Sequence, residues 1–188
     1  MKLHELIKQP LTDFRNFMGG NDAPYNRDDI EVYFYRHGFT SMGSGSFATV
    51  MEHPKLRYVI KVFDYKDQGY PAFLTFIDQY PETKHLPKFI GKPMQVLDSV
   101  YAIRMEKLSK DIPQWFQDTF SSLRGVMRSP RYEQGIINAE EEHPKDLVTL
   151  VQALSLYAEQ HRLVDDLRWG NIMMRGDVPV VTDPYVKL

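Results

Sequence analysis

Apolar residues recur every three or four positions in several stretches of the chain, a spacing that places them on one face of a helix. The clearest stretch covers residues 144–160, where Pro144 suits the first turn and the apolar face consists of Leu147, Leu150, Val151, Leu154 and Tyr157. We therefore predict a helix there. The same spacing predicts further helices over residues 3–17, 27–37, 70–80 and 112–123.

Short runs of β-branched and aromatic residues, bounded by glycine, proline and polar turn residues, predict strands that come mainly before the later helices, with a short hairpin at the end. Residues 39–64 predict a hairpin that continues into a third strand. Further strands are predicted over 94–97, 100–105, 172–174 and 178–182, the last two joined by a turn at 175–177.

Residues 129–142 show neither pattern. Pro130, Gly135 and the acidic run at 140–142 predict a surface loop with solvated charges. The order of the elements predicts an α+β fold with two lobes that meet near residues 105–109. We expect three parts along the chain: an N-terminal helical segment (1–38), a lobe built mainly of strands (39–108) and a mostly helical lobe (109–188).

Composition narrows the classes of function. The 188 residues carry 23 Lys and Arg against 25 Asp and Glu, a net charge of −2, which argues against binding nucleic acid by phosphate neutralisation. No apolar run reaches the roughly 20 residues of a membrane span, and no signal-type stretch follows Met1. The absence of cysteine excludes disulfides and thiolate chemistry and fits a cytosolic setting. Catalysis would have to use carboxylates, hydroxyls, His or Lys.

The first candidate constellation combines a glycine-rich turn with a lysine. Gly43 and Gly45 stand at a predicted strand-to-strand turn, where a backbone without Cβ atoms can approach a ligand and its amides can face phosphate oxygens. Lys61 follows on the next strand inside an apolar run, where a lysine is costly to bury unless it meets an anion.

The second constellation spans Asp166 to Asn171 and includes Asp183, which ends a predicted strand. Two carboxylates and an amide carbonyl are hard oxygen ligands that can hold Mg²⁺ against a triphosphate. The spacing of all three behind a long helix indicates phosphoryl transfer.

Together the two constellations resemble the protein-kinase signature set. Residues 43–50 resemble the glycine-rich loop with Ala48 in place of the third glycine, Lys61 resembles the phosphate-pairing lysine, and residues 105–108 resemble the hinge. Several blocks are similar to the early serine/threonine protein kinases of short-tailed lytic phages of the autographivirus type. These blocks are Gly45, Phe47, His53-Pro54, Val59-Ile60-Lys61-Val62, Gly170-Asn171-Ile172-Met173, Gly176-Asp177-Val178-Pro179 and Thr182-Asp183-Pro184.

The resemblance, which runs from about Phe39 to Pro184, implies a two-lobed kinase fold with an antiparallel sheet in the N-lobe and a minimal, mostly helical C-lobe. It implies that ATP lies between the lobes and that Asn171 and Asp183 hold Mg²⁺. It also implies that Asp166 takes the acceptor proton and that Arg168 lies near the γ-phosphate. The implied nucleotide-binding residues are Gly43, Ser44, Gly45, Ser46, Phe47, Val50, Lys61, Glu106 and Leu108.

The sequence departs from the wider kinase pattern at Val164-Asp165 and at Pro184-Tyr185. Asp78 and Glu82 are candidate ion-pair partners for Lys61, although each also fits a solvated face. Only five residues follow Asp183, so we expect no activation loop, no later helices and no basic C-terminal extension.

Two alternatives stay open: a nucleotide-binding pseudokinase that docks on a host protein, and a small-molecule phosphotransferase with a similar Gly-Asn-Ile loop. The resemblance implies host bacterial proteins as substrates or docking targets and the host cytoplasm as the location. It implies neither nucleic acid nor membrane as a partner. A short C-lobe would expose apolar surface that a second copy could cover as a homodimer. Trp169 either packs beneath the loop or serves as a platform for an acceptor or partner.

Overall fold

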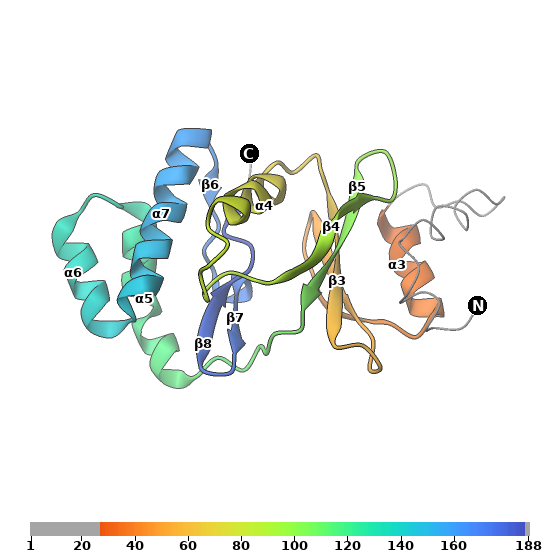
Figure 1. The fold of residues 1–188 in the computed structure, drawn as a ribbon, viewed down its shortest axis with the longest axis horizontal. Helices are drawn as coiled ribbons and strands as arrows, with labels where there is room; N and C mark the ends of the chain where they lie inside the picture. The colour runs from red at the N-terminus through yellow and green to blue at the C-terminus, as the bar shows by residue number, and fades with distance from the viewer. Residues whose placement is uncertain (1–26, 187–188) are drawn as a thin grey trace. The chain divides into compact units, whose positions relative to one another are not determined.

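The computed structural model describes residues 27–186, so the predicted helix over 3–17 lies outside the described residues. These residues form a mixed α+β structure (Figure 1). They group into two compact units, the first made of 27–66 and 88–107 and the second of 67–87 and 108–186. Segment 67–87 therefore groups with the second unit, whereas we predicted it inside a lobe of 39–108.

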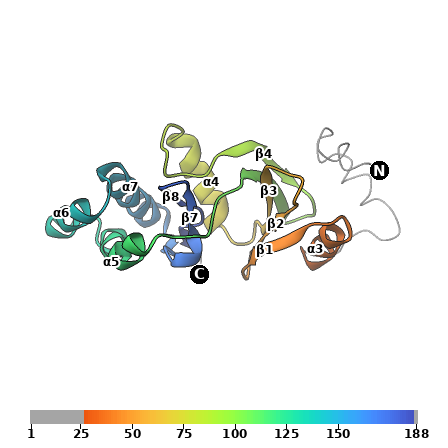
Figure 2. The ribbon, with the colours of Figure 1, turned by 90° about the horizontal axis from the view of Figure 1, so that it is seen from below.

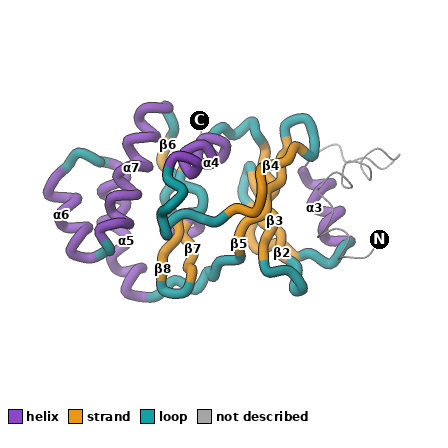
Figure 3. Tube along the Cα trace, in the orientation of Figure 1, coloured by secondary structure: helices purple, strands orange, loops and turns teal. Residues whose placement is uncertain are grey.

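The first unit contains a five-stranded sheet, whose strands are drawn in orange in Figure 3. Its order is β1-β2-β3-β5-β4, with every neighbouring pair antiparallel. The predicted hairpin and third strand over 39–64 are confirmed. The strands are β1 (Thr40–Ser44), β2 (Ala48–Glu52), β3 (Tyr58–Asp64), β4 (Phe89–Gln95) and β5 (Val100–Glu106).

Strand β4 begins at Phe89, five residues before the predicted start at Met94. We predicted that this strand starts after Pro93, because proline has no amide hydrogen to donate to a neighbouring strand. Strand β4 tolerates it because β4 is an edge strand whose register with β5 is irregular between Ile90 and Met94. Gly91, with φ of +81°, supplies the left-handed residue in this irregular stretch.

Helix α3 (Arg27–Arg36) confirms the predicted helix over 27–37 and packs on one face of the sheet (Figure 2). Gly38 follows it with φ of +81° and ends it. The core of this unit lies between the helix and the sheet and includes Ile30, Tyr33, Phe34, Phe39, Met51, Leu56, Ile60, Val62, Val96, Val100 and Ala102. Because side chains alternate along a strand, the neighbours of Ile60 and Val62 on β3 face the opposite side of the sheet.

The second unit is mostly helical, and Figure 1 shows three of its helices side by side. They are α5 (Gln114–Arg128), α6 (Glu133–Glu142) and α7 (Lys145–His161), and the unit also holds α4 (Gly69–Gln79). The predictions of α4, α5 and α7 are confirmed. All five residues of the predicted apolar face of α7 are buried.

The predicted surface loop over 129–142 is wrong, because residues 133–142 form α6. Helix α6 buries only Ala139, so it has no buried apolar face. Without such a face, the spacing of apolar residues could not predict this helix. Gly135 is a helix-weakening residue with a packing role, since a Cβ there would lie 2.7 Å from Cδ1 of the Tyr132 ring.

The predicted closing hairpin is confirmed as β7 (Ile172–Arg175) and β8 (Val178–Val181), with Gly176 at φ of +59° in the turn. Three short elements were not predicted: strand β6 (Val164–Asp165), the 3₁₀ turn η1 (Trp169–Asn171) and strand β9 (Tyr185–Val186). Strands β6 and β9 pair with each other and bracket the loop that carries the second constellation.

Candidate functional site

The glycine-rich turn joins β1 to β2 and is held by main-chain hydrogen bonds on both sides. The Gly45 amide donates to the Ala48 carbonyl at 2.8 Å, and the Phe47 carbonyl accepts from the Asp64 amide at 2.8 Å. Gly43 stands at a register shift in the β1–β2 pairing. The whole predicted phosphate-binding run 43–47 is exposed, as a turn that receives a soluble ligand must be.

Lys61 is buried, with 4% of its surface exposed, in the middle of the sheet. It pairs in register with Val50 on β2 and with Ile103 on β5, so these three side chains share one face of the sheet. This face is opposite to the one that α3 covers. Lys61 and Val50, the predicted phosphate and adenine contacts, therefore lie on the same face of the sheet.

The predicted hinge residues follow at the end of β5. The Glu106 carboxylate accepts from the Lys88 amide at 2.7 Å, and its own amide donates to the Lys88 carbonyl at 2.9 Å. Leu108 is 5% exposed. Asp78 and Glu82, the suggested partners of Lys61, are exposed residues of the second unit, and their pairing with Lys61 stays a prediction.

In the second unit, the loop with Asp166 begins where α7 ends. Arg162 adopts the left-handed conformation at φ of 55° and reverses the chain, and the Leu163 amide returns to the Ala158 carbonyl at 2.9 Å. The β6–β9 pair follows, and the Asp166 amide then donates to the Pro184 carbonyl at 2.7 Å. Asp166 is therefore fixed to the residue that follows Asp183.

Asn171 closes the loop on Asp166. Its side-chain Nδ2 donates to the Asp166 carbonyl oxygen at 2.6 Å and to Asp166 Oδ2 at 3.0 Å. The other carboxylate oxygen, Oδ1, pairs with the guanidinium Nε of the exposed Arg168. The structure thus brings Asp166, Arg168 and Asn171 together in one loop.

Asp183 is connected to the same loop through its neighbour Thr182. The Thr182 amide and hydroxyl both donate to the Asn171 carbonyl, at 2.8 and 3.1 Å. Tyr70, at the start of α4, is fully buried near Asp183. Burial, together with the negative charge of Asp183, raises the pKa of the Tyr70 phenol well above its usual value.

The oxygen ligands of the loop fit a magnesium ion. Because Asn171 uses Nδ2 to hold Asp166, Oδ1 is the atom of its side chain that can bind a cation, and Asp183 adds a carboxylate. Within residues 27–186 no group of three or more His, Cys, Asp or Glu side chains is placed to hold a metal. Two protein ligands are nevertheless typical of Mg²⁺, which keeps several waters and takes phosphate oxygens from its substrate.

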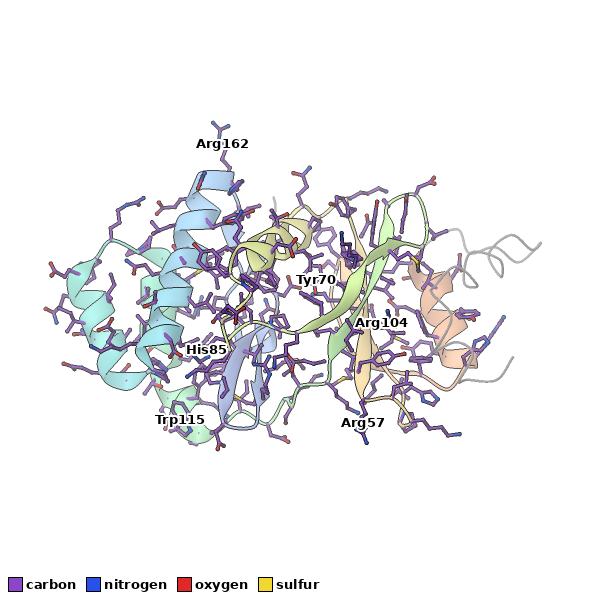
Figure 4. All side chains as sticks on the ribbon, viewed as in Figure 1. Arg57, Tyr70, His85, Arg104, Trp115 and Arg162 are labelled. Atoms are coloured by element: carbon purple, nitrogen blue, oxygen red, sulfur yellow. The ribbon has the colours of Figure 1, made fainter. Side chains whose placement is uncertain are left out.

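Trp169 packs on α5 and also remains accessible. Its ring centroid lies 4.2 Å from that of Phe120 and 6.4 Å from that of Phe116, while 42% of the residue is exposed. The packing interpretation is therefore supported. Trp115, labelled in Figure 4, is a second exposed tryptophan in this unit, at 46%.

The side chains that hold the glycine-rich turn on the α3 side were not predicted from the sequence. Thr49 is completely buried and hydrogen-bonds both Glu31 of α3 and Ser44 of the turn. Glu31 and Thr49 are 18 positions apart, so no local spacing could have predicted this contact. Tyr70 beside Asp183 was missed for the same reason.

Comparison with known proteins finds matches only among solved structures. No family model and no curated protein matches this chain. Among solved structures, the crystal structure of Rad53 1-466 in complex with AMP-PNP matches with a TM-score of 0.38 and 17% identity, over 82% of this chain and 41% of that one. This chain therefore spans less than half the length of that structure, and the proposals below rest on the site residues and not on this similarity.

In the part of the chain that the structure describes, no helix combines the length and the apolar character that crossing a bilayer requires.

Proposed function

We propose that the chain transfers the γ-phosphoryl group of ATP to Ser or Thr hydroxyls of proteins, as a compact kinase of the phage type that its sequence resembles. The observation that carries this proposal is the loop in which one amide group of Asn171 holds both the carbonyl and the carboxylate of Asp166. Asp183 belongs to the same hydrogen-bonded unit through Thr182. This arrangement offers a base and two cation ligands at fixed relative positions.

In this proposal the first unit binds the nucleotide. Val50 and Glu106 contact the adenine, and the amides of the exposed turn face the phosphates. Lys61 neutralises phosphate charge, which offsets the cost of burying its ammonium group in the sheet.

The second unit performs the transfer. Asp166 accepts the proton of the acceptor hydroxyl while that oxygen bonds to the γ-phosphorus and the bond to the β-phosphate oxygen breaks, releasing ADP. Asn171 fixes the direction of the carboxylate. In this proposal Arg168, which is exposed and paired with Asp166, neutralises charge that develops on the transferred group.

Magnesium, when bound to Asn171 and Asp183, would neutralise charge on the phosphates. From the family resemblance we further propose that the substrates are host bacterial proteins, including those of transcription and RNA processing. The chain would then act in the host cytoplasm.

The test is phosphate transfer from γ-labelled ATP with Mg²⁺, using the purified chain alone and with a bacterial lysate. We expect label on Ser and Thr and a loss on the order of 10²-fold in Asp183→Ala. Asp177→Ala is the matched control, because Asp177 is an exposed aspartate in the β7–β8 turn and should leave the rate unchanged.

Three other results would contradict this proposal or its assay. Nucleotide binding without any label would contradict the kinase proposal and favour a pseudokinase that docks on a partner. Label that appears on an added small-molecule acceptor and not on protein would favour a small-molecule phosphotransferase. Label that persists in Asp183→Ala would indicate a contaminating kinase.

A further inference from the structure

Side chains of α3 hold the glycine-rich turn from one side. Arg27 Nη1 donates to the Ser46 carbonyl in the turn at 3.0 Å. The Glu31 carboxylate lies 3.5 Å from Arg27 Nε and accepts a hydrogen bond from the Thr49 hydroxyl just after the turn. Although residues 43–47 are exposed, the turn is thus tied to a helix that precedes the sheet in sequence.

The hydrogen bonds in this group have a defined direction. A hydroxyl has one proton, and the Thr49 hydroxyl donates that proton to the Glu31 carboxylate, which can only accept. The 2.9 Å contact between Ser44 Oγ and Thr49 Oγ1 therefore has Ser44 as its donor. The result is a relay from Ser44 through Thr49 to Glu31 that ends on a negative charge.

Behind the exposed Ser44, the part of the relay formed by Thr49 and Glu31 is sheltered from solvent. Thr49 is 0% exposed, and the side chains of Arg27 and Glu31 are 19% and 16% exposed. Hydrogen bonds to ionised groups are stronger than neutral ones, and successive bonds in a low dielectric polarise one another. The group is therefore better suited to order the turn than a surface ion pair would be.

The relay also changes which atoms can meet a phosphate. Since the Ser44 hydroxyl proton points to Thr49, Ser44 cannot donate it to a ligand while the relay is intact. The Gly45 amide is likewise engaged with the Ala48 carbonyl. The main-chain amides of Ser46 and Phe47 at the tip of the turn, together with the Ser46 hydroxyl, can then face the anion.

We propose that Glu31, Arg27 and Thr49 are positioning residues that order the glycine-rich turn before the nucleotide binds. This inference rests on the proposed function, because it takes the ligand to be a nucleoside triphosphate. A turn ordered in advance spares the ligand the entropic cost of ordering it. Without the relay, binding should weaken in the ground state and the transition state alike, which raises KM for ATP and leaves kcat nearly unchanged.

The first experiment measures the order of the turn without any nucleotide. Amide hydrogen exchange at residues 44–48 is compared among wild type, Thr49→Val, which removes the hydroxyl at similar size, and Thr49→Ser, which keeps it. We expect exchange about tenfold faster in Thr49→Val and close to wild type in Thr49→Ser, on the basis that a lost hydrogen bond costs about that factor. Equal exchange rates in all three proteins would overturn the proposal.

Two further variants keep this result interpretable. Ile30→Val truncates a fully buried residue of the same helix that lies outside the relay, so it controls for a general loss of stability and should leave exchange in the turn unchanged. Glu31→Gln keeps an acceptor oxygen and removes the charge. It should loosen the turn partially, and it replaces Thr49→Val if that variant does not fold.

The second experiment measures AMP-PNP affinity by calorimetry together with the kinetics of phosphate transfer. We expect Thr49→Val to raise Kd and KM for nucleotide about fivefold or more, with kcat within about twofold of wild type. A fall in kcat with unchanged Kd would overturn the positioning role. A wild-type chain that binds no nucleotide would refute the proposed function and the nucleotide part of this inference, while the exchange data would still decide whether α3 orders the turn.

Discussion

Asn171 joins two parts of the candidate loop through one amide group. Its Nδ2 holds the backbone and the carboxylate of Asp166, and its Oδ1 is left for a cation. Both tasks need the amide, because a carboxylate at this position could not donate and would stand beside another negative charge.

We therefore predict that Asn171→Asp lowers the rate of phosphate transfer on the order of 10²-fold and also lowers the melting temperature. Asn138→Asp makes the same chemical change at an exposed position of α6 and should affect neither quantity. The measurements are initial rates at saturating ATP and thermal denaturation of both variants. Full activity in Asn171→Asp would remove this residue from the proposed machinery.

At the scale of residues, the sequence predicted contacts between neighbours and missed contacts between distant positions. Asp166 and Asn171 are five apart, and a tight loop is enough to bring them together. The relay from Glu31 to Thr49 depends on how α3 packs over the sheet, which no local spacing reveals. A buried hydroxyl also gives no sequence signal, because threonine is common in strands for its branched shape alone.

Among the elements, α4 is held very close to β9 at Gly69. A Cβ at this position would lie 2.5 Å from the carbonyl oxygen of Tyr185 and 2.9 Å from Cα of Val186, both of them backbone atoms. Aromatic contacts continue along the helix, since Phe73 packs against Tyr185 with ring centroids 6.2 Å apart. The glycine therefore sets the distance at which this helix docks.

We predict that Gly69→Ala lowers the free energy of unfolding by about 1–3 kcal/mol, as expected for overpacking against backbone that cannot yield. Gly125→Ala is the matched control in α5. A Cβ there meets nothing within 4 Å, so this variant should stabilise the protein by about 0.5–1 kcal/mol through its helix propensity. Urea denaturation of both variants measures the difference, and a neutral Gly69→Ala would contradict the close docking.

His143 links α5 to the start of α7 and is buried. Its Nε2 donates to the Thr119 carbonyl at 2.9 Å, and its buried Nδ1 has no hydrogen-bond partner among the described residues. Burial lowers the pKa of His143, opposed in part by the Thr119 carbonyl and the charge of Glu142. The folded protein thus holds this histidine neutral at a pH where the unfolded chain is already protonated.

This difference predicts that stability falls on acidification. Below the unfolded pKa of about 6.5 the unfolded chain binds a proton that the folded chain does not, so the unfolding free energy drops by up to about 1.4 kcal/mol per pH unit. The loss should begin near pH 7 and continue down to the folded pKa. Urea denaturation between pH 7.5 and pH 5 should show a flatter profile for His143→Gln than for wild type, and parallel profiles would contradict the assignment.

Most helices and strands followed from periodicity, and the exceptions have physical causes. Helix α7 has an apolar face that is buried throughout, so its pattern was strong. Helix α6 buries one alanine and contains Gly135, so its local pattern was that of a loop although packing makes it helical. The short pair β6 and β9 depends on a distant partner and has no pattern of its own.

For the whole molecule, binding of ATP should raise thermal stability. A ligand at about 100 times its Kd adds about 2.7 kcal/mol to the unfolding free energy, which corresponds to roughly 5–11 °C in Tm for a chain of this size. We expect this shift with ATP and Mg²⁺, and a smaller one for Asp183→Ala that no longer depends on Mg²⁺. No shift at millimolar ATP would contradict nucleotide binding.

The division of the chain into units was the least predictable feature at this scale. Both units are discontinuous, because segment 67–87 groups with residues 108–186 and segment 88–107 completes the sheet of the first unit. The sequence suggested a simple succession of lobes, because its predicted strands came mainly before its predicted helices. Which sheet or helix a segment joins depends on contacts such as Gly69 with Tyr185, far away in sequence.

The pairing of α4 with β9 also determines the order in which the protein can mature on the ribosome. Helix α4 emerges early in synthesis, but its docking partner Tyr185 is translated roughly 5–20 s later at about 5–20 residues per second. Until then the apolar side chains of α4, Phe73 and Phe76 among them, lack this cover. A nascent chain stalled before Tyr185 would expose this helix and should be a preferred target for chaperones and proteases.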